Sequence, residues 1–180
     1  MGPPGVMMTG AHLVRRFVGS LVPGGPAAPE EQWARRQLLD GERVLWDRLS
    51  GPDRRHAAGV ARAVEDTLGP DATRPVLAAA LLHDVGKLDA GLGVWGRVAA
   101  TVVGLAGGRD RAVGWEERGG PAGRVGRYLR HPERGAVMLG EAGSDELTVA
   151  WARCHHTPPE RWDPVIPPAT GTALKRGDDD

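Results

Sequence analysis

The sequence of 180 residues has little cysteine, no excess of charge and no long apolar run, and each of these excludes a class of protein. Its one cysteine, Cys154, excludes an internal disulfide and is typical of a reducing compartment. Lys and Arg (23) balance Asp and Glu (23), so no excess charge favours nucleic acid or a membrane surface as a partner. The longest uncharged apolar stretch, 98–108, is too short to cross a bilayer. Arg15 and Arg16 interrupt the apolar residues near the N-terminus, so we expect no signal peptide and a cytoplasmic protein.

Apolar residues follow a helical rather than an alternating pattern, and no run with the period of a strand lies between turn signals. The fold class predicted is all-α, a compact multi-helix bundle. We expect an N-terminal helical extension over 1–50, with helices at about 11–21, after Pro29 and after Gly41, and one domain over 51–180. The helices expected in that domain lie at about 53–68, 74–84, 94–106, 122–130, 132–142, 145–156 and 167–176, and 107–121 is expected to be a loop bordering a pocket.

The most informative segment is His83-Asp84-Val85-Gly86-Lys87, which follows the uncharged apolar run 76–82. A helix that is apolar on every side is buried, and adjacent ionisable groups at its end need a partner or a metal ion. An imidazole beside a carboxylate is a good pair of metal ligands. The sequence therefore predicts a metal site in the interior.

Other histidines also occur at helix ends or on apolar faces. His56 follows the capping box Ser50-Gly51-Pro52-Asp53 and shares a helical face with Val60, Ala63, Val64 and Thr67. His131 precedes Pro132 and is expected to be the N-cap of the next helix. The pair His155-His156 ends an apolar stripe. Taken singly, His56 is typical of a core histidine, His131 of a turn histidine in solvent and Cys154 of a small buried apolar residue rather than a ligand.

Taken in order, these elements resemble the HD-domain superfamily of metal-dependent phosphohydrolases, in the subgroup that contains the HD-GYP domains. The matching segments read HDVGK from His83, HPERGAVML from His131 and CHHTPPERW from Cys154. The resemblance covers roughly Asp53 to Asp178. The segment after the His-His pair lacks the Asp-Gly-x-Gly-Tyr-Pro sequence of HD-GYP domains, so specificity for cyclic di-GMP is not carried over.

The resemblance implies that His56, His83, Asp84 and a late aspartate hold one divalent transition metal ion. Asp84 would bridge to a second ion held by His131, His155 and His156. Iron, manganese, zinc or cobalt suits such ligands better than magnesium. Asp178 fits the late aspartate best, although 178–180 also has the composition of a frayed acidic tail, and Asp163 is the alternative.

Lys87 is one of only two lysines, and Asp84 and Lys87 are the predicted catalytic residues. Lys87 would contact a metal-bound phosphate, although a solvated lysine at a helix end is the simpler interpretation. The expected function is hydrolysis of a nucleotide or another phosphate mono- or diester, with a small nucleotide-like phosphate as substrate. A catalytically silent HD-fold module that binds metal or nucleotide for regulation is the alternative, and a helical bundle whose histidines bind nothing is a third.

Overall fold

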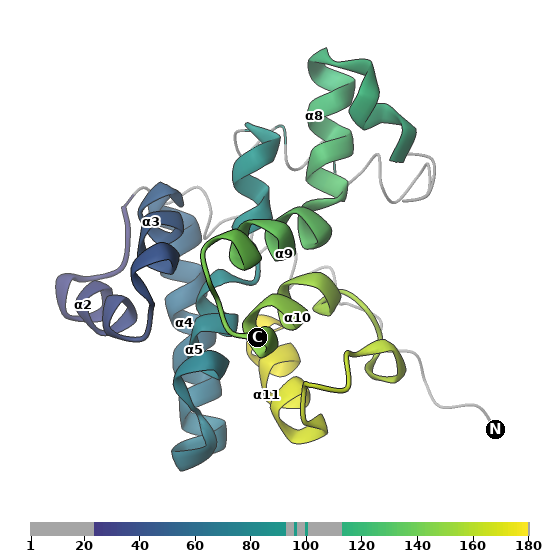
Figure 1. Cartoon of the computed structure of the whole chain (residues 1–180). Helices are drawn as coiled ribbons and strands as arrows, with labels where there is room; N and C mark the ends of the chain where they lie inside the picture. The colour runs from purple at the N-terminus through teal and green to yellow at the C-terminus, as the bar shows by residue number, and fades with distance from the viewer. Residues whose placement is uncertain (1–23, 93–95, 97–99, 101–112, 180) are drawn as a thin grey trace.

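The computed structural model describes residues 24–92, 96, 100 and 113–179 (Figure 1). These residues form helices and contain no strand, which confirms the all-α prediction. The helices are α2 (Ala28–Arg36), α3 (Asp40–Arg48), α4 (Gly51–Leu68), η1 (Gly69–Asp71), α5 (Arg74–Leu82), η2 (Val85–Ala90), η3 (Val113–Arg118), α8 (Gly120–Leu129), α9 (His131–Glu141), α10 (Glu146–Cys154), η4 (Pro159–Arg161) and α11 (Pro168–Asp179). The helix expected at 11–21, and all of the one expected at 94–106 except residues 96 and 100, lie outside the described residues.

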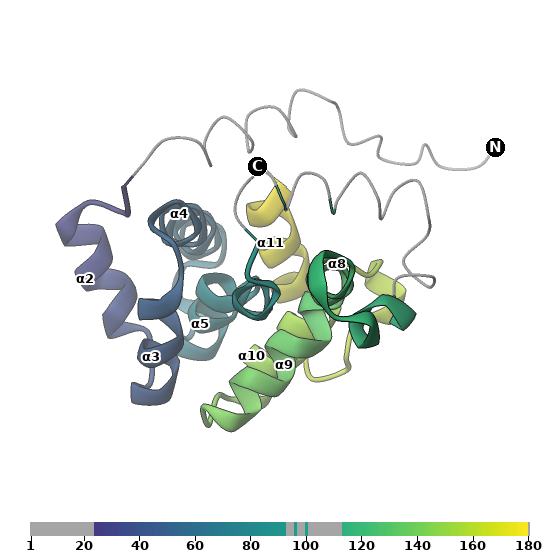
Figure 2. The ribbon, with the colours of Figure 1, turned by 90° about the horizontal axis from the view of Figure 1, so that it is seen from above.

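Helix α5 lies in the middle of the bundle, in contact with α3, α4, α10 and α11 (Figure 2). Every residue from Val76 to Leu82 is buried, as the apolar run predicts. A helix enclosed in this way has no freedom to shift without opening the core. It therefore fixes the position of His83 and Asp84, which follow its last residue.

Helices α2 and α3 contribute to the same hydrophobic core as the helices that follow them. Trp46 is fully buried in that core, and its indole N–H donates a hydrogen bond to Glu31 Oε1 at 2.7 Å. Leu45 and Leu49 pack beside it. No helix among the described residues combines the length and the hydrophobicity that crossing a bilayer requires.

The Ser50 cap is present, but the face predicted for α4 is partly wrong. Ser50 Oγ accepts from the Asp53 N–H at 3.3 Å, as an N-cap should. The buried stripe of α4 consists of Ala57, Ala58, Val60, Ala61 and Val64, whereas Thr67 is exposed and donates back to the Ala63 carbonyl at 2.7 Å. Helix α4 contacts both α5 and α11, and the small side chains of the alanines allow neighbouring helices to approach closely.

Several predicted boundaries also differ from the structure. Helix α5 ends at Leu82 rather than 84, and the chain continues as the 3-10 helix η2. His131 is the first residue of α9 and not its N-cap, because α8 and α9 are joined through the single residue Arg130. Residues 113–118 of the expected loop form η3, and α11 extends to Asp179. Helix ends are set by packing as well as by local sequence, so they are the least predictable part of an element.

Candidate metal centre

His83 and His155 come immediately after the last residue of a helix, and His131 comes two residues after the end of α8. The Nδ1 atoms of His83, His131 and His155 lie 2.9, 2.7 and 2.9 Å from the carbonyl oxygens of Ala80, Tyr128 and Ala152, each three residues earlier. The carbonyls of a last helical turn have no partner within the helix, so an imidazole can satisfy them. A carbonyl only accepts, so Nδ1 carries the proton in these contacts. In each neutral ring, Nε2 is therefore the atom with a free lone pair, as metal ligation requires.

One group of side chains joins α4, the end of α5 and α11. Asp178 Oδ1 lies 3.4 Å from both His56 Nε2 and His83 Nε2. Asp178 is 4% exposed and belongs to α11, so the structure does not place it in a frayed tail. Gly177 makes this possible: a Cβ there would lie 3.2 Å from the Val60 carbonyl oxygen of α4, one turn beyond His56. The absence of a side chain at 177 lets α11 bring Asp178 to His56.

A second group lies on the other side of Asp84. The ligand atoms of Asp84, His131, His155 and His156 all lie within 4.8 Å of one another, and so do those of Asp84, His56 and His83. Asp84 Oδ1 is 3.4 Å from His131 Nε2 and 3.7 Å from His155 Nε2, while Oδ2 is 3.4 Å from His83 Nε2. The two oxygens of Asp84 thus face different histidines. This cluster could bind a metal ion.

The charges of the centre favour a cation. Burial opposes protonation of His83, but the carboxylates of Asp84 and Asp178 raise the pKa of His83 to about 10. Burial also opposes ionisation of Asp84, yet Lys87 and His83 hold the pKa of Asp84 well below its usual value. Burial lowers the pKa of His131 to about 4. The Asp84 carboxylate therefore stays ionised beside imidazoles, and a metal ion at His83 Nε2 would replace a proton there.

Lys87 lies on η2 and is not a solvated residue at the end of a helix. Its side chain is 16% exposed, and its Nζ forms an ion pair with Asp84 Oδ2. The 3-10 helix brings this about, because residues three apart lie above one another there. The structure thus places the ammonium group at the same carboxylate that faces both groups of histidines.

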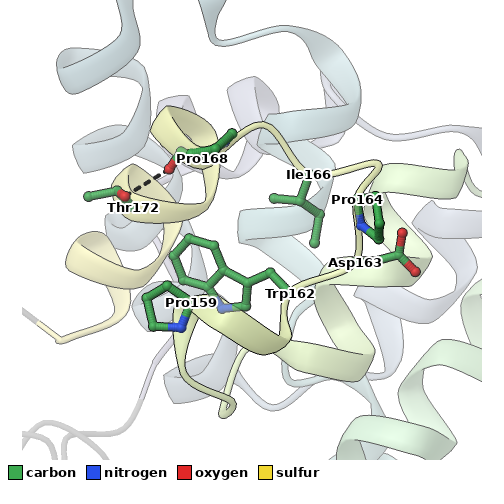
Figure 3. Close-up of a pocket in the computed structure, with 7 residues that line it drawn as sticks. All are labelled: Pro159, Trp162, Asp163, Pro164, Ile166, Pro168 and Thr172. Atoms are coloured by element: carbon green, nitrogen blue, oxygen red, sulfur yellow. Dashed lines mark hydrogen bonds between the residues drawn. The ribbon is translucent and has the colours of Figure 1, made fainter.

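Asp163 occupies a different part of the molecule. It lies on the loop before α11, where its Oδ1 accepts from the Val165 N–H at 3.1 Å. Figure 3 shows it with Trp162 and Pro168 around a shallow hollow of about 290 Å³. Asp163 and the buried Cys154 are not among the residues whose ligand atoms cluster in the described part of the chain.

This placement predicts opposite results for two aspartates. Asp178→Asn keeps the size of the side chain but removes the charge next to His56 and His83, so we expect a loss of bound metal and of any hydrolytic activity. Truncation after Gly177 should have the same effect. Asp163→Asn retains the oxygen that caps Val165 and should leave both properties unchanged. Elemental analysis of the purified variants measures the metal, and a silent Asp178→Asn together with a metal-free Asp163→Asn would reverse the assignment.

Sequence analysis did not identify two features that shape the centre. One is the set of backbone carbonyls that orient His83, His131 and His155, and its signal is a histidine one or two residues after the last residue of a helix. The other is the close contact of Gly86 with α9, which joins segments 45 residues or more apart and has no local signal.

Scans against family models, curated proteins and solved structures found no match to this chain, so functional inference rests on the site and on the sequence motifs.

Proposed function

We propose that the protein is a metal-dependent phosphohydrolase that acts on a nucleotide or another phosphate mono- or diester, as its resemblance to the HD-domain superfamily implies. One observation carries the proposal. His83 Nε2, His155 Nε2 and Asp84 Oδ1 are buried and make no hydrogen bond. Buried polar atoms without partners are costly, and two imidazole nitrogens together with one oxygen of the neighbouring carboxylate fit a bound cation.

His56, His83, Asp84 and Asp178 would hold one ion, and Asp84, His131, His155 and His156 a second. Because imidazoles outnumber carboxylates, the donor set suits iron, manganese, zinc or cobalt. Such ions, when bound, lower the pKa of coordinated water and polarise a phosphoryl oxygen. His156 is the exposed member of the second group, so that side of the centre is open to a substrate.

Other groups of the chain would orient the ligands and stabilise the charge that develops on the substrate. The carbonyls of Ala80, Tyr128 and Ala152 accept from Nδ1 of three imidazoles and so orient each ring with Nε2 towards the ligand position. Lys87 supplies a fixed positive charge beside Asp84, where it can stabilise the negative charge that develops on a phosphoryl oxygen. Positions set before the reaction avoid a reorganisation cost during it.

The test combines metal analysis with a substrate panel. The purified protein should contain at least one transition metal ion per chain, and chelation should lower its melting temperature because the ion binds the folded state. Metal-loaded protein should hydrolyse at least one phosphate monoester or diester in a panel of nucleotides and aryl phosphates. Bound metal without hydrolysis of any compound would favour the silent regulatory module, and a metal-free protein insensitive to chelation would contradict the proposal.

A further inference from the structure

We infer that Gly86 is a positioning residue: its contact with the first turn of α9 sets the distance between His131 and Asp84 and so builds the second ion site. The inference rests on the proposed function, because it concerns the same centre. It assigns a separate role to a residue that has no side chain to bind metal or substrate.

The contact is between backbones. A Cβ on Gly86 would lie 1.9 Å from the carbonyl oxygen of His131, 2.6 Å from the nitrogen of Gly135 and 2.8 Å from the carbonyl carbon of His131. Separations below 3 Å cannot persist, and backbone atoms cannot turn aside as the end of a flexible side chain can. Gly86 is not among the glycines with positive φ, so alanine suits its backbone conformation. The close approach of α9 is therefore the feature that excludes a side chain at position 86.

The two groups of ligands should respond differently to a side chain at 86. Asp84 and Gly86 follow α5, which is buried from Val76 to Leu82 and resists displacement, whereas α9 is only partly buried and carries the exposed Val137. We therefore expect α9 to move, and to carry His131 away from Asp84 Oδ1. His56, His83 and Asp178 belong to α4, the end of α5 and α11, whereas the three atoms nearest to a Cβ at 86 all belong to α9. The first group should keep its arrangement.

The chain offers a graded series of substitutions. At Gly135, which faces η2 from α9, a Cβ would lie 3.1 Å from the Gly86 nitrogen and 3.4 Å from Val85 Cγ1. At Gly140, further along the same helix, a Cβ would meet nothing within 4 Å. Gly86→Ala should thus have the largest effect, Gly135→Ala a smaller one, and Gly140→Ala is the matched control.

The experiment is a titration of the metal-stripped full chain and the three variants with Co²⁺, followed by calorimetry and visible absorption. We expect the parent and Gly140→Ala to bind two ions. In Gly86→Ala the first ion should bind as in the parent, while the affinity for the second should fall by about 10–100-fold, the usual effect of disturbing groups that orient ligands. In Gly135→Ala the affinity for the second ion should lie between those of the parent and of Gly86→Ala. The inference would be overturned if Gly86→Ala bound both ions with the affinities of the parent, or if its affinities for the two ions fell equally.

A second measurement separates this inference from the proposed function. If the parent binds no Co²⁺, the metal-dependent function fails, and if it binds a single ion the two-ion arrangement fails. NMR spectra of the backbone amides, recorded on the metal-free proteins, then decide the role of Gly86. Gly86→Ala should shift the signals of residues 131–135 and leave those of His56 and Asp178 in place, whereas Gly140→Ala should leave all of them in place. Unshifted signals at 131–135 would show that Gly86 does not position His131.

Discussion

Asp84→Asn should remove most of the bound metal and abolish hydrolysis, the largest effect that we expect of any substitution. Asp84 is the one residue shared by both groups of ligand atoms. Asparagine keeps the shape but loses the negative charge, and its amide nitrogen cannot act as a metal ligand. Disturbing groups that only orient ligands costs about 10–100-fold in metal affinity, so loss of a shared ligand should cost more. Elemental analysis and activity on the best substrate of the panel measure the two effects.

Asp89→Asn is the matched control for this prediction. Asp89 lies on η2, the 3-10 helix that follows Asp84, and pairs with Arg134 instead of with a histidine. We expect its metal content and activity to equal those of the parent. Melting temperatures in a chelator separate loss of metal from loss of fold, because they compare the variants without an ion. Stoichiometric metal in Asp84→Asn with an intact fold would contradict the assignment of the centre.

The apolar run before His83 made the central part of the fold predictable from sequence. An uncharged helix has only one stable environment, the interior, so the burial of 76–82 and the inward position of His83 follow from composition. His155 was found for a related reason, since it ends an apolar stripe, whereas His56 on an apolar face and His131 at a helix start were identified through the order of the motifs. Their meeting in one cluster is a tertiary result that no local pattern contains.

The choice between Asp178 and Asp163 shows where sequence reasoning stops. Both residues follow His155-His156, and the composition at the C-terminus suits a tail as well as a helix. The structure places Asp178 beside His56 and His83, because Gly177 lets α11 approach α4 at Val60 and so buries Asp178. Close approach of two helices depends on residues more than 100 positions apart. The local sequence around either aspartate therefore does not predict it.

Lys87→Ala should separate turnover from metal binding. The Lys87 ammonium group contacts Asp84, so it repels any cation that binds the same carboxylate. Removing it should leave the metal content unchanged or raise the affinity for metal. Turnover should nevertheless fall about tenfold to a thousandfold, because a charge that meets an oxyanion mainly as the oxyanion develops contributes to the transition state. No ligand substitution should produce this combination.

The measurement is kcat at saturating substrate together with metal content for Lys87→Ala, Lys87→Arg and Lys175→Ala. Lys175, the other lysine of the chain, forms an exposed pair with Asp179 on α11 at 3.0 Å and serves as the control, with activity equal to that of the parent. Lys87→Arg should retain part of the activity, since the charge is kept while its position changes. Full turnover in Lys87→Ala would make the lysine a partner of Asp84 alone. A fall in metal content that parallels the fall in kcat would mean that Lys87 supports the centre structurally, because a cation has no other way to favour a second cation at Asp84.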